Sequence, residues 1–441
     1  MTQASSMAVR TLLGAAPRYA SLLKSQYWDR ATFGRYTEAR ISRTLEAAAA
    51  IPFYAARFGG VPKAADLGNL AVLKREDIAA LNRSVRSRQC FSRKPFTHGC
   101  TTGSTFMPAE FLFDASHQRG RLAARFRYLH ENGWRASHRS AWIIRGFAED
   151  TIEGKLIKTR LPLGASFLPI STRATEQADW LRKVDPLYLC TVPSNLELLL
   201  DVLAERGRRI PSLRRIFAGS EVLDASVREK ARRVLGVDIA DNYGATEAFL
   251  GWECPRGGLH VNAEHVYMEI VDDRGKPVPP GAMGKVVITT LENYLMPLVR
   301  YEVGDYAVAV EGRCGCGRTL PLIGRLVGRG VNLLRMPGGE LLSPCGPVRA
   351  VVAQFRQIEE GSGLKRFQLV QRDVRDYAVR YVSERVLGGG VERLVQGALE
   401  QELGFSVSVA TERVAELPRA PGGKFMMVVS EMAAAGSGVC R

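Results

Sequence analysis

Several features that would set this chain apart from ordinary globular proteins are missing from its sequence. No run of about 18 consecutive apolar residues occurs among the 441 residues, so no membrane insertion is expected. The opening segment (MTQASSMAVRTLLGAAPRYA) has neither a continuous apolar core nor a small-residue cleavage site, so no secretory signal peptide is expected. Cysteine is sparse, with eight residues, of which only Cys314 and Cys316 lie close together. This cysteine pattern fits a protein of the reducing cytoplasm with one metal site better than it fits a disulfide framework.

Acidic residues are outnumbered by basic ones, 45 against 61, and the formal net charge is +16. The basic residues are spread along the chain, with short clusters at residues 206–209 and 228–233, and no recognisable nucleic-acid module accompanies them. A solvated basic surface is the simpler interpretation, so no nucleic-acid partner is expected. Binding of nucleic acid through charge alone is the alternative, and a strongly salt-dependent DNA affinity would reveal it.

The length favours two domains of unequal size, since one hydrophobic core seldom organises 441 residues. Apolar positions at helical spacing predict helix through residues 8–58, with an interruption near Pro52. From residue 95 to 250, short apolar runs alternate with longer amphipathic segments, which is typical of α/β layers. There we expect strands at residues 141–144, 215–218 and 236–241, and helices at 195–205 and 224–235.

Two later regions have different patterns. Strand-like runs at residues 266–271, 285–290 and 306–310 are separated by Gly/Pro turns and predict a small β subdomain. Beyond residue 330 the pattern is α+β, with strands at 367–371 and 377–382 and a helix at 391–403. The expected fold is therefore a large multi-layer α/β N-terminal domain (1–327) containing the β subdomain, followed by a small α+β C-terminal domain (328–441).

A loop rich in hydroxyl groups and glycine occupies residues 98–108 (HGCTTGSTFMP). Ser and Thr hydroxyls donate hydrogen bonds to phosphate oxygens, and glycine permits close approach of the backbone. The loop lacks the lysine of the P-loop pattern. Taken alone, it is more simply interpreted as a surface turn.

Three other segments carry charged side chains beside turns. In residues 243–247 (YGATE), Glu247 could hold Mg²⁺ and Thr246 a phosphate, and a capped helix N-terminus is the alternative. In residues 300–305 (RYEVGD), Asp305 follows a turn, where it could accept both ribose hydroxyls or form an Asx-type turn. In residues 417–425 (LPRAPGGKF), Lys424 could stabilise a reacting phosphate or be a solvated hairpin lysine.

The order and spacing of these segments, with a Gly-Arg pair at 328–329, resemble the adenylate-forming enzyme superfamily. Residues 51–54 (IPFY), 73–77 (LKRED) and 217–221 (FAGSE) resemble its phenylacetate–CoA ligase branch, which includes proteins of capsular polysaccharide biosynthesis. The resemblance extends over residues 30–430. It implies an acid–thiol ligase that converts a carboxylic acid, by default an aryl acid, to an acyl-adenylate with release of pyrophosphate, and then transfers the acyl group to CoA.

The resemblance also implies roles for individual residues. ATP phosphates would be cradled by the loop residues Thr101, Thr102, Gly103, Ser104 and Thr105. The adenine would be bordered by Gly219, Ser220, Glu221, Asn242, Tyr243 and Gly244. Thr246 and Glu247 would contact phosphate and Mg²⁺, Asp305 the ribose, and Arg325 or Arg329 the nucleotide. Lys424 would reach the reacting acyl-phosphate from the C-terminal domain, which in this superfamily is a mobile lid. Trp142, Phe147, Tyr188 and Phe217 are candidate walls of the acid pocket.

Two departures from the family pattern bear on these roles. Phe106 stands where the phosphate loop usually has glycine, and Met107 where a lysine or similar polar residue is frequent. After Gly328-Arg329, Val331 and Asn332 stand where the family usually shows two aspartates, one of them the interdomain hinge. The first departure affects the shape of the phosphate loop. The second affects rotation of the lid, and with it the thioester step.

Cys254, His260, Cys314 and Cys316 make up a possible zinc set. Three cysteines and one histidine form a closed tetrahedral site, whose usual role is structural. The spacing also allows unligated buried thiols and a surface histidine. Members of the similar branch carry a Cys/His cluster at these points, so the resemblance implies zinc.

Alternatives remain open at this point. The acyl acceptor could be a carrier-protein thiol, an amine or a hydroxyl, or AMP could be transferred to another molecule. The substitutions at Phe106, Val331 and Asn332 favour a degenerate, non-catalytic nucleotide-binding protein, whereas Glu247, Asp305 and Lys424 favour an enzyme. A homodimer is one open possibility for the assembly.

Overall fold

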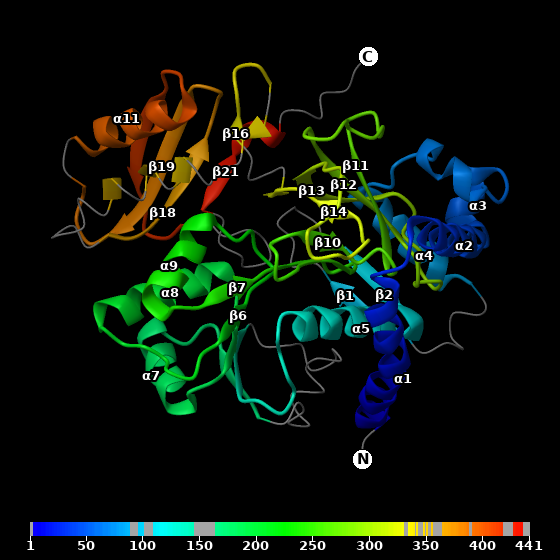
Figure 1. Cartoon of the computed structure of the whole chain (residues 1–441). Helices are drawn as coiled ribbons and strands as arrows, with labels where there is room; N and C mark the ends of the chain where they lie inside the picture. The colour runs from blue at the N-terminus through cyan, green and yellow to red at the C-terminus, as the bar shows by residue number, and fades with distance from the viewer. Residues whose placement is uncertain are drawn as a thin grey trace. The chain divides into compact units, whose positions relative to one another are not determined.

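The computed structural model describes most of the chain and divides it into two compact units (Figure 1). The described residues are 3–88, 96–100, 109–144, 164–329, 334–339, 341–342, 347–348, 350–351, 354–355, 364–387, 390–417 and 427–434. Unit 1 comprises residues 1–100, 109–303 and 307–326, and unit 2 comprises residues 101–108, 304–306 and 327–441. In the part of the chain that the structure describes, no helix is long and apolar enough to cross a membrane.

Unit 1 begins with three helices where we expected one interrupted helical stretch. They are α1 (Gln3–Ser25), α2 (Arg30–Ala49) and α3 (Pro52–Phe58). The Asp29 carboxylate caps α2 by accepting from the backbone N–H of Thr32 at 2.9 Å. Pro52 does not only interrupt a helix but also opens α3, because a missing N–H costs nothing at the first helical position. The segments η1 (Ala64–Asn69), η2 (Arg75–Asp77) and α4 (Ile78–Arg86) follow.

A five-stranded parallel sheet forms the centre of unit 1. Its strand order is β4 (Ala165–Pro169), β3 (Ser140–Ile144), β5 (Tyr188–Cys190), β6 (Arg215–Phe217), β7 (Asp238–Ala240). The connecting helices are α7 (Ala174–Val184), α8 (Pro193–Glu205) and α9 (Ala225–Leu235). The expected elements in this region are confirmed, because buried parallel strands and amphipathic helices have distinct patterns.

The two faces of this sheet pack against different elements. Leu189, Ile216 and Ile239 belong to one hydrophobic core with side chains of α7, α8 and α9. The alternate residues Phe217 and Ala240 belong to another core with Tyr128 of α5 (Ala115–Glu131). In Figure 1, β6 and β7 accordingly lie between α7–α9 on one side and α5 on the other. Alternation of side chains along each strand explains this division.

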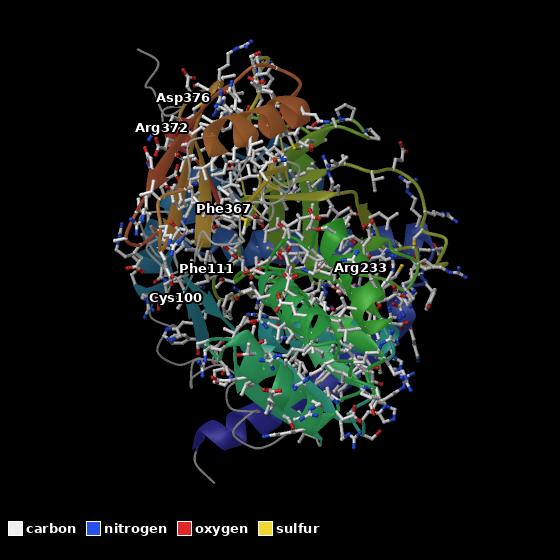
Figure 2. All side chains as sticks on the ribbon, turned by 90° about the vertical axis from the view of Figure 1, so that its left-hand side faces the viewer. Cys100, Phe111, Arg233, Phe367, Arg372 and Asp376 are labelled. Atoms are coloured by element: carbon white, nitrogen blue, oxygen red, sulfur yellow. The ribbon has the colours of Figure 1, made fainter. Side chains whose placement is uncertain are left out.

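Antiparallel strands make up the rest of unit 1. The hairpin β1 (Thr97–Cys100)–β2 (Glu110–Phe113) precedes α5, and Figure 2 labels Cys100 and Phe111, one on each strand. A second sheet has the order β14 (Leu322–Ile323), β10 (Leu259–Val261), β9 (Phe249–Glu253), β8 (Asn242–Gly244). The predicted β subdomain is the sheet β11 (Val266–Val271), β12 (Met283–Thr290), β13 (Tyr301–Val308), β15 (Leu326–Arg329); the chain passes between the two units within β15. The expected α/β fold class is therefore confirmed.

Unit 2 contains a four-stranded sheet and one long described helix. The strand order is β20 (Ser408–Arg413), β19 (Asp376–Ser383), β18 (Leu364–Gln371), β21 (Val428–Ser430). In the turn from β18 to β19, the backbone N–H of Arg372 donates to the Asp376 carbonyl at 2.8 Å, and both residues are labelled in Figure 2. Helix α11 (Val391–Leu403) buries Val391, Val395, Leu399 and Leu403, spaced four residues apart, in one core with β18 and β19. The short elements are β16 (Leu334–Arg335), β17 (Leu341–Leu342) and η5 (Glu431–Ala434).

Candidate active site

The loops after β6 and β7 meet at one edge of the parallel sheet. Because neighbouring parallel strands end on the same side, the residues that follow them lie next to one another. The Asn242 side chain joins the two loops, since its Nδ2 donates to the carbonyl of Ala218 at 2.5 Å. A Cβ atom on Gly219 would overlap the Asn242 amide, so this position requires glycine. Two segments predicted to border the nucleotide, 219–221 and 242–244, are therefore in contact.

Glu221 has a structural partner that the sequence did not indicate. Its Oε2 accepts from the backbone N–H of Ser194, in the first turn of α8, at 3.0 Å. A carboxylate at a helix N-terminus is stabilised by the unpaired N–H groups and by the helix dipole. The preceding residue, Ser220, is exposed and has a φ of 68°, a conformation that costs energy for a non-glycine residue. The Glu221 contact holds this strained loop in place.

The Thr246–Glu247 turn joins β8 to β9. A capped helix N-terminus, the alternative interpretation of this segment, is excluded because strands flank it on both sides. A Cβ atom on Gly99 would lie 3.0 Å from the Thr246 methyl carbon, so the turn lies directly against β1. Gly99 comes two residues before Thr101, the first of the residues predicted to cradle the phosphates. The structure therefore brings the first strand of the loop hairpin together with Thr246.

The predicted zinc ligands converge in unit 1, and their donor atoms lie within 4.8 Å of one another. The Cys254 and Cys314 sulfurs are 3.6 Å apart, and the Cys316 sulfur is 3.2 Å from Nε2 of His260. Nδ1 of His260 faces the Leu320 carbonyl at 3.3 Å, which favours the tautomer with Nε2 free for a metal. A Cβ atom on Gly258 would lie 2.6 Å from the Cys314 sulfur, so the backbone closes tightly over the cluster.

The chemistry of this donor set fits zinc. Burial raises the pKa of Cys254 to about 12 in the absence of a cation and lowers the pKa of His260 to about 4. Burial also opposes ionisation of Cys316, but hydrogen bonds from Arg318 outweigh it and lower the pKa of that thiol. A neutral imidazole and thiols that a divalent cation can ionise are the ligands of closed zinc sites.

Other predicted site residues lie elsewhere or outside the described residues. The expectation that Asp305 follows a turn is wrong, because Asp305 lies half-buried within β13, after Gly304 with a φ of 91°. The Asx-type turn is excluded with it. Arg325 is exposed and lies between β14 and β15. Arg329 is the last residue of β15, and only its backbone belongs to the described part of the structure. Thr101 to Thr105, Phe106, Met107, Phe147, Val331, Asn332 and Lys424 lie outside the described residues.

Two titratable residues beside the site, half-buried Asp241 and fully buried His117, could not be identified from the sequence. Asp241 directly precedes Asn242, and its pKa is raised to about 7, mainly by burial, which Arg228 opposes and Glu253 reinforces. His117 is fully buried against the backbone of Glu247, and burial, followed by His265 and Arg121, lowers its pKa well below the ordinary value. Neither residue belongs to a short motif, and contacts between distant segments create both environments.

Comparisons with known proteins agree with this geometry. A family described as AMP-binding enzyme matches residues 163–295. Phenylacetate-coenzyme A ligase of Thermus thermophilus is 28% identical over 60% of this chain and 65% of its own length. The Pseudomonas putida ligase of the same name is 26% identical over 57% of this chain and 58% of its own length. The chain thus aligns with less than two thirds of the length of either relative.

Solved structures share the fold. A 2-hydroxyisobutyryl-CoA ligase with bound 2-HIB-AMP has a TM-score of 0.70, at 19% identity, and the match covers 93% of this chain and 94% of that one. The anthranilate CoA ligase AuaEII with anthranoyl-AMP has a TM-score of 0.55, at 19% identity, over 76% and 65% of the two chains. These solved structures show the fold alone. The AMP-binding family match and the phenylacetate-coenzyme A ligase relatives, together with the motifs, support the adenylate-forming enzyme superfamily and its phenylacetate–CoA ligase-like branch.

Proposed function

We propose that the protein activates a carboxylic acid with ATP and transfers the acyl group to the thiol of CoA. The observation that carries the proposal is the contact of Thr246 with Gly99, because it joins the YGATE turn to the hairpin of the phosphate loop. The contact of Asn242 with Gly219 brings together the two segments that would border the adenine. Similarity to the phenylacetate-coenzyme A ligases supports the same activity.

The proposed chemistry has two steps. A carboxylate oxygen of the acid attacks the α-phosphorus of ATP, pyrophosphate leaves, and an acyl-adenylate remains. The CoA sulfur then attacks the acyl carbon, and AMP leaves with the oxygen that came from the acid. Positioning and charge stabilisation contribute most of the catalysis in such reactions.

The chain's own residues would divide these tasks. Residues 101–105 and Thr246 would bind the phosphates, the 219–221 and 242–244 segments the adenine, and Asp305 the ribose. Glu247 would hold Mg²⁺, which neutralises phosphate charge when bound. Arg325 or Arg329 would contact the nucleotide, and Lys424 would stabilise the charge that develops on the reacting phosphate. We assign these last two roles to a lid at residues 328–441 and to the chain segment leading into it.

For the acid, we propose an aryl substrate. The rings of Tyr128 and Tyr188 pack edge-to-face against Phe217 in the hydrophobic core, with centroids 5.6 and 6.0 Å from the Phe217 ring. Such rings favour an aromatic ligand next to the residues that would bind the adenylate. Phe217 is the last residue of β6, directly before the 218–221 loop.

For the metal, we propose one structural zinc ion held by Cys254, His260, Cys314 and Cys316. The zinc would crosslink the β9–β10 turn to the segment before β14, about 60 residues later, and so stabilise unit 1. We also propose a cytoplasmic location, since none of the five described cysteines forms a disulfide and free thiols persist in reducing compartments. A homodimer remains a proposal from sequence.

A different acyl acceptor is the second candidate. A fatty acid–[acyl-carrier-protein] ligase, ScoC of Streptomyces coeruleorubidus, is 27% identical over 29% of this chain. An amide bond synthetase of Marinactinospora thermotolerans shares the fold with a TM-score of 0.51 at 17% identity. A carrier-protein thiol or an amine would leave the first chemical step unchanged.

The test is a library of carboxylic acids screened for pyrophosphate release from ATP. We expect release with a subset of aryl acids, and an acyl-CoA product by mass spectrometry when CoA is added. Release of pyrophosphate without an acyl-CoA product would favour the other acceptors. Tight nucleotide binding without release for any acid would instead identify a degenerate binding protein.

A further inference from the structure

His117 lies beneath the Thr246–Glu247 turn. Its ring stacks on Phe113 with centroids 4.8 Å apart and an interplanar angle of 9°, and it faces the backbone of Glu247. Phe113 also packs against β1, because a Cβ atom on Gly99 would lie 2.9 Å from the Phe113 ring and 3.0 Å from the Thr246 methyl carbon. The Thr246–Glu247 turn, which would bind metal and phosphate, therefore packs against His117 and the neighbouring Phe113.

A chain of polar residues, buried except for the half-buried Arg18 at its end, packs against the His117 ring. The His265 ring packs against it, with centroids 4.6 Å apart. Nδ1 of His265 lies 3.0 Å from the Glu292 carboxylate, and the other oxygen of that carboxylate lies 2.7 Å from the Arg18 guanidinium on α1. A Cβ atom on Gly120 would overlap the Glu292 carboxylate, so α5 has glycine where the network passes. Such a buried, paired network restricts the position of the ring.

The ring nitrogens of His117 have unused bonding capacity. Within the described residues, neither Nδ1 nor Nε2 makes a hydrogen bond of normal length and angle, although the ring faces the Glu247 backbone. A buried polar atom without a partner costs free energy, and in a native fold it commonly has a functional reason. Hydrogen bonds of active sites are frequently long without ligand and shorten in the complex.

We propose that His117 is a positioning residue for the metal–nucleotide site, an inference that rests on the proposed function. When Mg²⁺ and ATP bind, a ring N–H donates to the Glu247 backbone carbonyl. This bond fixes the turn so that the Thr246 hydroxyl and the Glu247 carboxylate face the phosphates together. The contacts among His265, Glu292 and Arg18 fix the position of the His117 imidazole beneath the turn.

The test compares two substitutions with opposite losses. His117→Phe keeps an aromatic ring against Phe113 but removes the N–H donor, whereas His117→Gln removes the ring but keeps a donor. Isothermal titration calorimetry measures ATP binding with Mg²⁺ and with EDTA, and AMP binding with EDTA. The wild type should bind ATP more tightly with Mg²⁺. We expect the ratio of ATP affinity with Mg²⁺ to ATP affinity with EDTA to be about tenfold smaller in His117→Phe, because one hydrogen bond contributes about that much. The affinity for AMP should stay unchanged. His117→Gln should recover part of the gain.

His130→Phe is the matched control, since His130 lies on the same helix and its ring packs edge-on against Tyr19 of α1 at 6.0 Å. It should change the melting temperature without changing the Mg²⁺-dependent gain. A His117→Phe protein with the full gain and only a lower melting temperature would overturn the inference and leave His117 a packing residue. Wild-type protein that binds AMP and metal-free ATP but shows no Mg²⁺ effect would overturn it too. Wild-type protein that binds no nucleotide would overturn the proposed function and this inference with it.

Discussion

The sulfur of Cys254 lies 3.6 Å from the sulfur of Cys314, a residue 60 positions later in the chain. Pairing of β10 with both β9 and β14 creates this proximity, since His260 lies opposite Trp252 on one side and Leu322 on the other. The two cysteine-bearing turns therefore extend from neighbouring strands of one sheet. Distance along the sequence does not matter once the register is set.

The first prediction concerns the metal. Purified protein should contain about one zinc ion per chain, and Cys314→Ser should lose the ion and lower the melting temperature, because a structural site contributes folding free energy. Inductively coupled plasma mass spectrometry and thermal unfolding measure the two effects. Cys190→Ala is the control: Cys190 is buried in the hydrophobic core, so the variant should lose stability but keep its zinc. If chelation leaves metal-free wild-type protein with an unchanged melting temperature, the structural zinc site is ruled out.

The second prediction concerns a buried ion pair in unit 1. Arg127 and Glu264 are 0% and 1% exposed, with an N–O distance of 2.7 Å, and Arg127 also donates to Asn262 at 2.8 Å. Arg127→Met leaves the Glu264 carboxylate buried without its cation, so it should reduce the free energy of unfolding by about 3–5 kcal/mol. Urea denaturation measures the loss. Arg232→Ala, which breaks an exposed pair with Asp238, should leave the midpoint nearly unchanged. Equal midpoints for the two variants would contradict the assignment.

Much of the fold could be predicted from the sequence, and the predictions that were wrong or missing have physical reasons. The runs at 266–271 and 391–403 coincide with β11 and α11, because each element buries one regular face. The start of β13 was missed, since Gly304 in the RYEVGD segment was interpreted as a turn, whereas its positive φ is accommodated within a strand. His117 and Glu292 could not be predicted, because two isolated polar residues acquire a role only when α5 and the loop after β12 pack together. The convergence of the proposed zinc ligands could be expected, because three cysteines and one histidine make a tetrahedral set and the resemblance implies a Cys/His cluster at these positions.

The third prediction concerns the nucleotide. Glu247→Gln should weaken use of Mg²⁺-ATP, because it removes the charge that would hold the metal. Asp305→Ala should weaken ATP and AMP alike, since the ribose is common to both. Steady-state kinetics with an active acid and AMP inhibition constants separate the two effects. Wild-type values in both variants would contradict the assignments.

The fourth prediction concerns Lys424. If the lid delivers this lysine only for adenylation, Lys424→Ala should slow acyl-adenylate formation by about 10²–10³-fold, the usual cost of a lost electrostatic donor. Acyl transfer from a separately supplied acyl-adenylate should be much less affected, although Val331 and Asn332 replace the usual hinge residues. Single-turnover assays of each half-reaction measure the difference. Equal losses in both would mean that the lid does not alternate, and an unimpaired first step would mean that another lysine acts.

The central claim is that the acid becomes an acyl-adenylate, and the path of one oxygen atom tests it. An active acid labelled with ¹⁸O in its carboxylate is converted in the presence of ATP and CoA, and the products are analysed by mass spectrometry. If a carboxylate oxygen attacks the α-phosphorus, one ¹⁸O atom should appear in AMP and none in pyrophosphate. Appearance of ¹⁸O in inorganic phosphate, or unlabelled AMP alongside acyl-CoA, would contradict the account.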